Sequence, residues 1–143
     1  MIVISGIDDS SKEMVSSFLK GVPSIEKIDD NILDNACYAK EDERIVGCIS
    51  FEIFGKKGLI RYFVFKKILD DGVLNDLLKK LEEKAIDQGI KMFVCIAENY
   101  QIEELFKTLG FNKVENDLFF INEDNVKNTN FKNSSFLSKL LTY

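Results

Sequence analysis

The sequence of 143 residues contains no histidine and little cysteine. Without histidine, Ser-His-Asp and Cys-His catalysis, histidine metal sites and imidazole proton shuttles are excluded. The three cysteines, Cys37, Cys48 and Cys95, lie far apart and show no CxxC spacing. Each lies in an apolar run, so we expect buried reduced thiols rather than a disulfide framework or a zinc site.

Long apolar runs and an excess of basic residues are also missing. No window reaches the length of a membrane span, and the N-terminal MIVISGIDDS lacks the basic region and apolar core of a signal peptide. Lys and Arg number 19 against 24 Asp and Glu, and this net charge of −5 argues against nucleic acid as a partner. We expect a single cytoplasmic domain over residues 1–143, with no membrane partner.

Hydrophobic periodicity predicts a mixed α/β order of elements. Strands are expected at 1–5, 37–40, 44–54, 59–65, 91–97, from 111 towards 115, and at 136–143. Helices are expected from a capping box at 10–13 to Gly21, then at 24–35, 72–88 and 102–109. Gly55-Lys-Lys-Gly58 is typical of a tight hairpin turn, and the polar stretch 122–135 of a loop. Three hairpin-connected strands followed by two strand–helix units predict a mixed sheet with helices packed on it.

This order and several motifs resemble the GNAT superfamily of N-acetyltransferases over nearly the whole chain. The stretch GVLNDLLKKLEEKAIDQGIKMFVCIA, which begins at Gly72, is similar to the family's phosphate-binding helix and the strand after it. The stretches 96–99 (IAEN) and 105–111 (LFKTLGF) are similar to the family's later segment. The resemblance implies a GNAT-type mixed, mostly antiparallel central sheet with helices on both faces.

A closer likeness is to the arsenic-operon-associated acetyltransferases and their relatives among the N-acetylglutamate synthases. Gly47-Cys-Ile-Ser-Phe-Glu-Ile-Phe-Gly55 and Gly58-Leu-Ile-Arg61 are similar to segments of that subgroup, and Lys127–Phe131 looks like its loop before the last strand. The resemblance implies acetyl-CoA as co-substrate, no metal, and a small-molecule amine as acceptor, such as an amino acid or an analogue. It also allows a homodimer, since family members often pair through sheet edges.

The resemblance assigns the acetyl-CoA contacts residue by residue. The backbone of Phe63, Val64 and Phe65 pairs with the pantetheine arm, and Asn99 lies near that arm. Phe106 stands where the family has a tyrosine that protonates the departing thiolate, a role that phenylalanine cannot fill. The pyrophosphate is assigned to the backbone at the helix N-terminus, formed by Asp71, Gly72, Val73 and Leu74.

The phosphate loop departs from the family pattern Q/R-x-x-G-x-G/A. Gly72 is retained, but Leu69 stands in place of Gln or Arg and Leu74 in place of Gly or Ala. Asp70 and Asp71 place two negative charges beside the expected pyrophosphate, which weakens its binding unless both side chains point away. These departures leave a second hypothesis open: a GNAT-fold protein that has lost catalysis and acts as a binding or regulatory module.

Acyl transfer to an amine needs a proton acceptor, and in a chain without histidine this is a carboxylate, a tyrosine or a water chain. Glu52 is the candidate general base, because it lies mid-strand in an apolar stretch and matches the E-x-Y-G segment of the subgroup that the chain resembles. A structural alternative stands beside this role. If Phe54 faces Leu59 across the hairpin, then Glu52 faces Arg61 and the two form a cross-strand ion pair. Arg61 is also the candidate to bind a substrate carboxylate.

Four further residues keep two interpretations each. Asn99 is either a cofactor contact or a turn residue after its strand. Tyr100 is either a hydroxyl donor near the thiolate or an exposed aromatic at a helix start. Phe119 and Phe120 are either core or the wall of a substrate pocket.

Overall fold

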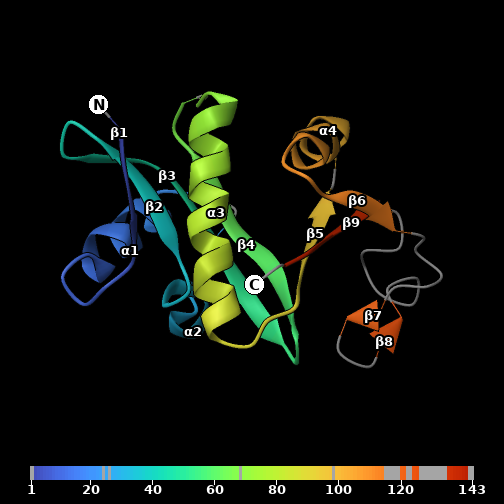
Figure 1. The fold of residues 1–143 in the computed structure, drawn as a ribbon. Coiled ribbons are helices and arrows are strands. Elements are labelled where there is room, and N and C mark those ends of the chain that lie inside the picture. The colour runs from blue at the N-terminus through green and yellow to red at the C-terminus, as the bar shows by residue number, and fades with distance from the viewer. Residues whose placement is uncertain are drawn as a thin grey trace.

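The computed structural model describes residues 2–23, 25, 27–67, 69–97, 99–114, 120–121, 124–125 and 135–141. The described elements follow the order that the periodicity predicts (Figure 1), except for two short strands at 120–121 and 124–125 that it did not predict. The second of these lies within the stretch 122–135, which was expected to be a loop. The strands are β1 (Ile2–Gly6), β2 (Cys37–Glu41), β3 (Arg44–Phe54), β4 (Lys57–Phe65), β5 (Met92–Ala97), β6 (Asn112–Val114), β7 (Phe120–Ile121), β8 (Asp124–Asn125) and β9 (Ser135–Leu140). The helices are α1 (Lys12–Lys20), α2 (Asp30–Leu33), α3 (Asp71–Asp87) and α4 (Tyr100–Thr108).

Seven of the described strands form one sheet in the order β1-β2-β3-β4-β5-β9-β6, while β7 and β8 pair separately. Within the described strands, β4 and β5 form the single parallel pair and the other pairs are antiparallel. The last strand, β9, lies between β5 and β6. The predicted mixed, mostly antiparallel sheet is therefore confirmed, and so is the strand expected near the C-terminal end of the sequence.

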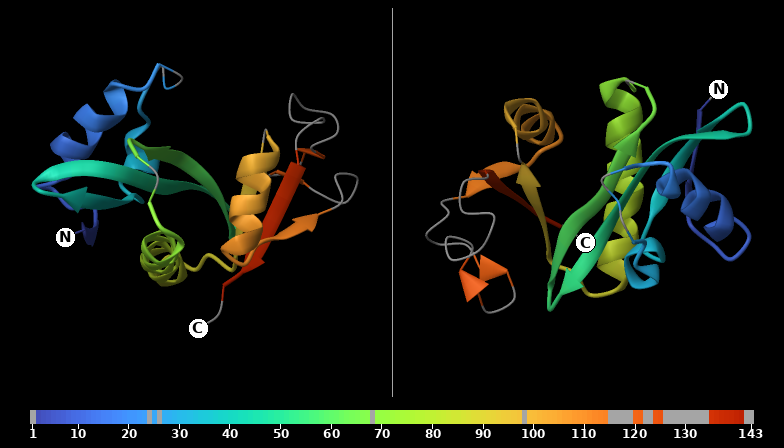
Figure 2. Two further views of the ribbon diagram at one scale, coloured as in Figure 1. Left: turned by 90° about the horizontal axis from the view of Figure 1, so that it is seen from above. Right: turned by 180° about the vertical axis from the view of Figure 1, so that it is seen from behind.

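Helices cover both faces of this sheet (Figure 2). The left view of Figure 2 shows α1 and α2 on one side of β2 and β3, and α3 on the other. The apolar cluster between the sheet and helices α3 and α4 includes Phe51, Leu77, Leu81, Phe93 and Phe106. The cluster on the opposite face, under α1 and α2, includes Val15, Leu19, Ile32, Leu33 and Tyr62.

Helix α3 forms as its apolar stripe predicts. Leu77, Leu78, Leu81 and Ala85 are buried on one side, while Lys79 points to solvent. The helix ends at Asp87, and Gly89, two residues further on, has a φ of +83°, which suits glycine. The Ile90 amide donates back to the Ala85 carbonyl oxygen at 3.1 Å. None of the described helices is both long and apolar enough to cross a membrane.

Helix α1 begins without the predicted capping box. Ser11 is its N-cap and makes no side-chain capping bond. Instead, Asp8 Oδ1 accepts from the Ser11 amide at 2.9 Å, and the Asp8 amide donates to Ser11 Oγ at 3.0 Å. Ser10, the first residue of the predicted capping box, donates to Asp8 Oδ1 at 2.7 Å, so its side chain bonds within the turn before the helix.

The helix predicted over 24–35 is mostly wrong, because α2 comprises only Asp30–Leu33. Asp29 has extended backbone (φ −87°, ψ 117°), and its carboxylate accepts from the Asn31 amide at 2.9 Å. An aspartate that caps a helix also starts it. Ile25 and Ile28 therefore pack against the cluster under α1 from outside any helix.

The buried carboxylate of Glu103 connects α4 to strands β6 and β9. Glu103, with 7% of its surface exposed, forms ion pairs with Lys107 at 3.7 Å and with Lys113 of β6 at 3.6 Å. Its hydrogen bond to Ser135 of β9, followed by the charges of Lys113 and Lys107, lowers the pKa of this carboxyl. The ionised form of Glu103 therefore stabilises the fold.

We predict that Glu103→Gln lowers the melting temperature at pH 7, because it removes the charge that the two lysines surround. The pKa of Glu103 is lowered from 4.5 in the folded state, so its stabilisation is present above that pH and is lost as the pH falls through the folded pKa. Thermal unfolding across this range checks both points, with Glu83→Gln on the exposed side of α3 as control. Equal melting temperatures of Glu103→Gln and the wild type at pH 7 would contradict the assignment.

Candidate functional site

The parallel pairing of β4 and β5 is short. It joins Lys57 with Met92, Gly58 with Phe93 and Leu59 with Val94, and then stops. Beyond these pairs the two strands diverge (Figure 1). The backbone of residues 60–65 that faces β5 therefore has no described strand beside it, and we call this the open edge of β4. The predicted pantetheine edge, Phe63–Phe65, forms the far half of the open edge.

A bulge lies within the open edge, at Tyr62. On the β3 side, the register passes from Ser50 opposite Arg61 to Cys48 opposite Val64, so two residues of β4 face Ile49 alone. Tyr62 has a φ of +52°, a conformation that costs a non-glycine residue of order 1–3 kcal/mol. Its burial and its hydroxyl, which accepts from the Asp29 amide at 2.8 Å, keep it in place.

Glu52 and Arg61 lie together beside this bulge. The Arg61 guanidinium donates to Glu52 Oε1 at 2.5 Å, with 41% and 30% of the two side chains exposed. The predicted register was wrong: Phe54 pairs with Lys57, and Arg61 lies opposite Ser50. The turn consists of Gly55 and Lys56 alone, which shifts β4 by two residues from the predicted alignment. The ion pair still forms, diagonally across the strands.

A pocket of about 510 Å³ opens at this ion pair. The residues around it come from β3, β4, α2 and the segment leading into α2: Lys27, Ile28, Asp29, Asp30, Ile32, Glu52, Arg61 and Tyr62. Its wall holds charges of both signs, with a carboxylate and a guanidinium already joined on one side. Such a pocket suits a small polar molecule that also carries both charges.

The N-terminus of α3 already carries a carboxylate. Asp70 is the N-cap, and its Oδ1 accepts from the Val73 amide at 2.9 Å. Among the described residues, the amides of Asp71 and Gly72 make no hydrogen bond. Leu69 and Leu74 are buried in the core on the α3 side. Asp70 therefore points onto the helix end, not away from it.

The three residues after β5 that were considered as cofactor contacts, Asn99, Tyr100 and Phe106, lie in different environments. Asn99 is exposed and caps α4, with its side-chain oxygen accepting from the Ile102 amide at 2.9 Å. Tyr100 is 71% exposed, and a hydrogen bond to Glu104 raises the pKa of its phenol. Phe106 is buried between Phe63 and Phe111, at ring distances of 5.0 and 5.1 Å. Phe106 thus links α4 to the strand that carries the open edge.

The cysteines supply no nucleophile here. All three are buried free thiols, and burial raises the pKa of Cys37 to about 11 and of Cys48 and Cys95 to about 12. In the ranges that the structure describes, no cluster of three or more Cys, Asp or Glu side chains is placed to bind a metal. Phe119 and Lys127–Phe131 lie outside the described residues, and Phe120 is placed only as backbone of β7.

Of the eight residues around the pocket, sequence reasoning assigned only Glu52 and Arg61 to a site. Tyr62 and Asp29 are among the six that it missed. A left-handed conformation usually calls for glycine, asparagine or aspartate, so a tyrosine gives no local signal of it. Asp29 belonged to the helix expected over 24–35. An aspartate followed by a second acidic residue, three positions before the apolar pair Ile32-Leu33, was the available signal for a helix start at that point.

The fold and the pocket define an α/β protein with a diverging parallel strand pair beside a charged cavity. The chain belongs to the GNAT acetyltransferases: the family model described as an acetyltransferase (GNAT) domain matches residues 7–131. A search of curated proteins finds no match.

Solved structures share the fold at low sequence identity. N-acetylglutamate synthase from Neisseria gonorrhoeae, complexed with coenzyme A and N-acetyl-glutamate, is 18% identical with a TM-score of 0.75. That match covers 100% of this chain and 36% of the synthase, so the chain spans about a third of that protein's length. A Mycobacterium tuberculosis protein in complex with CoA has a TM-score of 0.70 at 13% identity, covering 98% of this chain and 99% of that one. A GNAT-family acetyltransferase from Staphylococcus aureus Mu50 has a TM-score of 0.65 at 18% identity, covering 99% and 100%.

We predict that Phe106→Tyr destabilises the fold. The new hydroxyl lies among aromatic rings and loses its water without gaining a described partner, at a cost of about 1–3 kcal/mol. Denaturant unfolding measures this cost. Tyr100→Phe, which removes a hydroxyl from an exposed position, is the control and should stay within about 0.5 kcal/mol of wild type. An unchanged midpoint for Phe106→Tyr would show that the ring edge reaches water.

Proposed function

We propose that the chain is an acyl-CoA-dependent N-acetyltransferase that acts on the amine of a small molecule, such as an amino acid or an analogue. The observation that carries this proposal is the Glu52–Arg61 pair, which lines a pocket directly beside the open edge of β4. Family membership and the coenzyme A present in two of the similar structures support it.

The open edge suits the pantetheine arm of the donor. An extended chain with amide groups can pair with an unsatisfied strand edge, as peptides do when they add to a sheet. Phe63 and Phe65 pack into the core with their rings 4.7 Å apart, which fixes the backbone that would make these bonds. When bound, acetyl-CoA supplies an acetyl thioester, whose carbonyl carbon the amine attacks as the C–S bond breaks.

The end of α3 suits the pyrophosphate only in part. The amides of Asp71 and Gly72 remain as donors, and a helix N-terminus favours an anion. The Val73 amide is occupied by Asp70, which also places a negative charge where the pyrophosphate is expected. The donor therefore relies mainly on the open edge.

Glu52 and Arg61 are assigned to the acceptor. An ammonium group must lose a proton before it can attack, and the Glu52 carboxylate is placed in the pocket to accept it. Arg61 holds that carboxylate in one position and presents its remaining donors to a carboxylate of the acceptor. The ion pair and the catalytic role are compatible, because the pair orients the base.

A GNAT-fold binding or regulatory module is the second candidate. Asp70 on the α3 end, together with the buried Leu69 and Leu74, favours it. Thermal unfolding with acetyl-CoA, and with CoA alone, separates the two. A ligand at about 100 times its dissociation constant stabilises by about 2.7 kcal/mol, which shifts the melting temperature by several degrees. No shift at millimolar acetyl-CoA would favour the module.

We predict that Glu52→Gln lowers turnover by about 10²–10⁴-fold while the affinity for CoA stays unchanged, because the amide cannot accept the proton. Release of free thiol during acetylation of a panel of amino acids measures turnover, and calorimetry measures CoA binding. Glu83→Gln, exposed on α3, is the matched control. Full turnover by Glu52→Gln would remove Glu52 as the base and leave the ion pair as its role.

We also predict that Asp70→Ser binds CoA more tightly, on the order of tenfold at low salt. The substitution removes a negative charge from beside the pyrophosphate, while the serine hydroxyl still caps the helix. Asp76→Ser removes the same charge from an exposed position further along α3 and should change the affinity little. Equal affinities for Asp70→Ser and wild type would contradict a pyrophosphate at this helix end.

A further inference from the structure

Helix α2 forms one wall of the pocket, yet it has only four residues. A helix this short has no stability of its own, because nucleation costs more than its few hydrogen bonds return. Ile32 and Leu33 bury against the core under α1, which holds one side of the helix. Its polar ends need other partners, and the structure provides them from three different elements.

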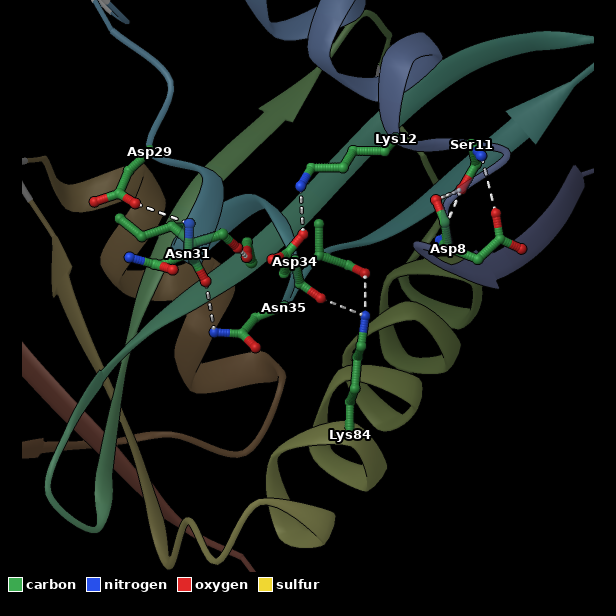
Figure 3. A network of polar contacts seen from close by, with 11 residues as sticks. Asp8, Ser11, Lys12, Asp29, Asn31, Asp34, Asn35 and Lys84 are labelled. Atoms are coloured by element: carbon green, nitrogen blue, oxygen red, sulfur yellow. Dashed lines mark hydrogen bonds and ion pairs between the residues drawn. The ribbon is translucent and has the colours of Figure 1, made fainter.

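The C-terminal end of α2 is bound by a lysine from the opposite helix layer. Lys84 of α3 extends across to α2 (Figure 3), where its ammonium donates to the carbonyl oxygens of Asp34 at 2.9 Å and Ala36 at 3.1 Å. A cation at a helix C-terminus satisfies carbonyl groups that have no partner within the helix. On the other side, Lys12 of α1 forms an ion pair with the Asp34 carboxylate at 2.9 Å.

Lys84 makes these contacts although its partly buried position removes water from its ammonium group. Burial lowers the pKa of its ammonium, and the nearby Cys37, Asp34 and Asp8 act against that shift. Its described bonds are to backbone oxygens, not to a carboxylate. Because Lys84 binds backbone oxygens, the contact stabilises the backbone conformation of the segment 34–36 and not the position of a side chain.

The opposite end of α2 is bound at the pocket itself. The Asp29 amide donates to the hydroxyl of Tyr62, the bulge residue next to Arg61. Within the helix, Ser50 Oγ donates to the Ile32 carbonyl oxygen, and just beyond it Asn35 Nδ2 donates to the Phe51 carbonyl oxygen at 3.0 Å. The one turn of α2 thus connects the end bound by Lys84 to the residues that line the pocket.

We propose that Lys84 is a positioning residue for the pocket. By capping α2, it sets how far Asp29 and Asp30 stand from Glu52 and Arg61, and so the size and charge pattern of the acceptor that fits between them. The identification of the occupant as an acceptor rests on the proposed function. The positioning itself does not.

The same helix also carries the end assigned to the donor. Lys84 lies twelve positions after Gly72, which corresponds to about 18 Å along a straight helix. One rigid element thus fixes both the N-terminal amides and the wall of the pocket. Movement of α3 relative to the sheet would change both at once.

Hydrogen exchange of Lys84→Met tests the positioning. The amides of Leu33, Asp34 and Ala36 report on α2 through their bonds to Asp29, Asp30 and Leu33, and the Asp29 amide reports on the pocket end. We expect exchange at both ends to rise together, on the order of tenfold, since a cation at a partly buried helix terminus is lost. A rise confined to residues 34–36, or no rise, overturns the proposal.

Two further variants frame the result. Lys79→Met makes the same change at an exposed position of α3 and should leave exchange in α2 unchanged. Lys84→Arg keeps a cation at the helix end, and its rates should fall between those of wild type and Lys84→Met; rates as fast as those of Lys84→Met would also overturn the proposal. Lys84→Arg serves as the test variant should Lys84→Met not fold.

Kinetics supply the second readout. In acetylation of the standard amino acids with acetyl-CoA, Lys84→Met should raise KM for the acceptor and leave the dissociation constant of CoA unchanged. An unchanged acceptor KM contradicts the proposal even if stability falls. If the wild type acetylates neither an amino acid nor another small amine, the proposed function fails, and the exchange experiment still decides the role of Lys84.

Discussion

The early end of pairing between β4 and β5 is the constraint on which the rest of the structure depends. Three residue pairs join the strands, after which their backbones separate. Strand backbones that leave one another must find other partners, because unpaired N–H and C=O groups are costly where water is excluded. The bulge at Tyr62 lies on the stretch that has separated, and so does Arg61. The charged pocket and the open edge of β4 therefore lie side by side because β4 diverges from β5.

Helix α3 joins the two halves of the site because it touches both layers. Its leucine stripe packs on the sheet, its first turn faces the end of β4, and Lys84 near its last turn reaches α2. These three contacts lie on one continuous helix, so α3 connects the sheet, the end of β4 and α2 through a single element. The fourth contact, between Lys139 of β9 and Glu82 at 2.6 Å, extends the same connection to the strand beside β5.

Much of the fold was predictable because its signals are local. The leucine spacing of α3 and the length of β3 need no information from elsewhere in the chain, and both predictions are confirmed. The hairpin register was not local: a turn of two residues and a turn of four fit the same Gly55–Gly58 sequence, and the difference moves every partner by two. The prediction of the Glu52–Arg61 pair still holds, because a shift of two residues keeps both side chains on one face of the sheet. Diagonal neighbours on one face are close enough to form an ion pair.

The parts of the site that sequence could not supply are long-range contacts made by unremarkable residues. Lys84 lies in a helix with four other lysine or glutamate neighbours on its polar side, and only its position near the start of β2 distinguishes it. For Asp70, the sequence revealed the residue's importance but not its contact. Its charge beside the expected pyrophosphate was evident from the sequence, but its bond to the Val73 amide was not. That bond changes the physical meaning of the residue, because a capping carboxylate stabilises the free helix and competes with any anion for the same donors. In the proposed function, the affinity for the donor therefore depends on how well its pyrophosphate competes with the Asp70 carboxylate, which is part of the chain, for the amides at this helix end.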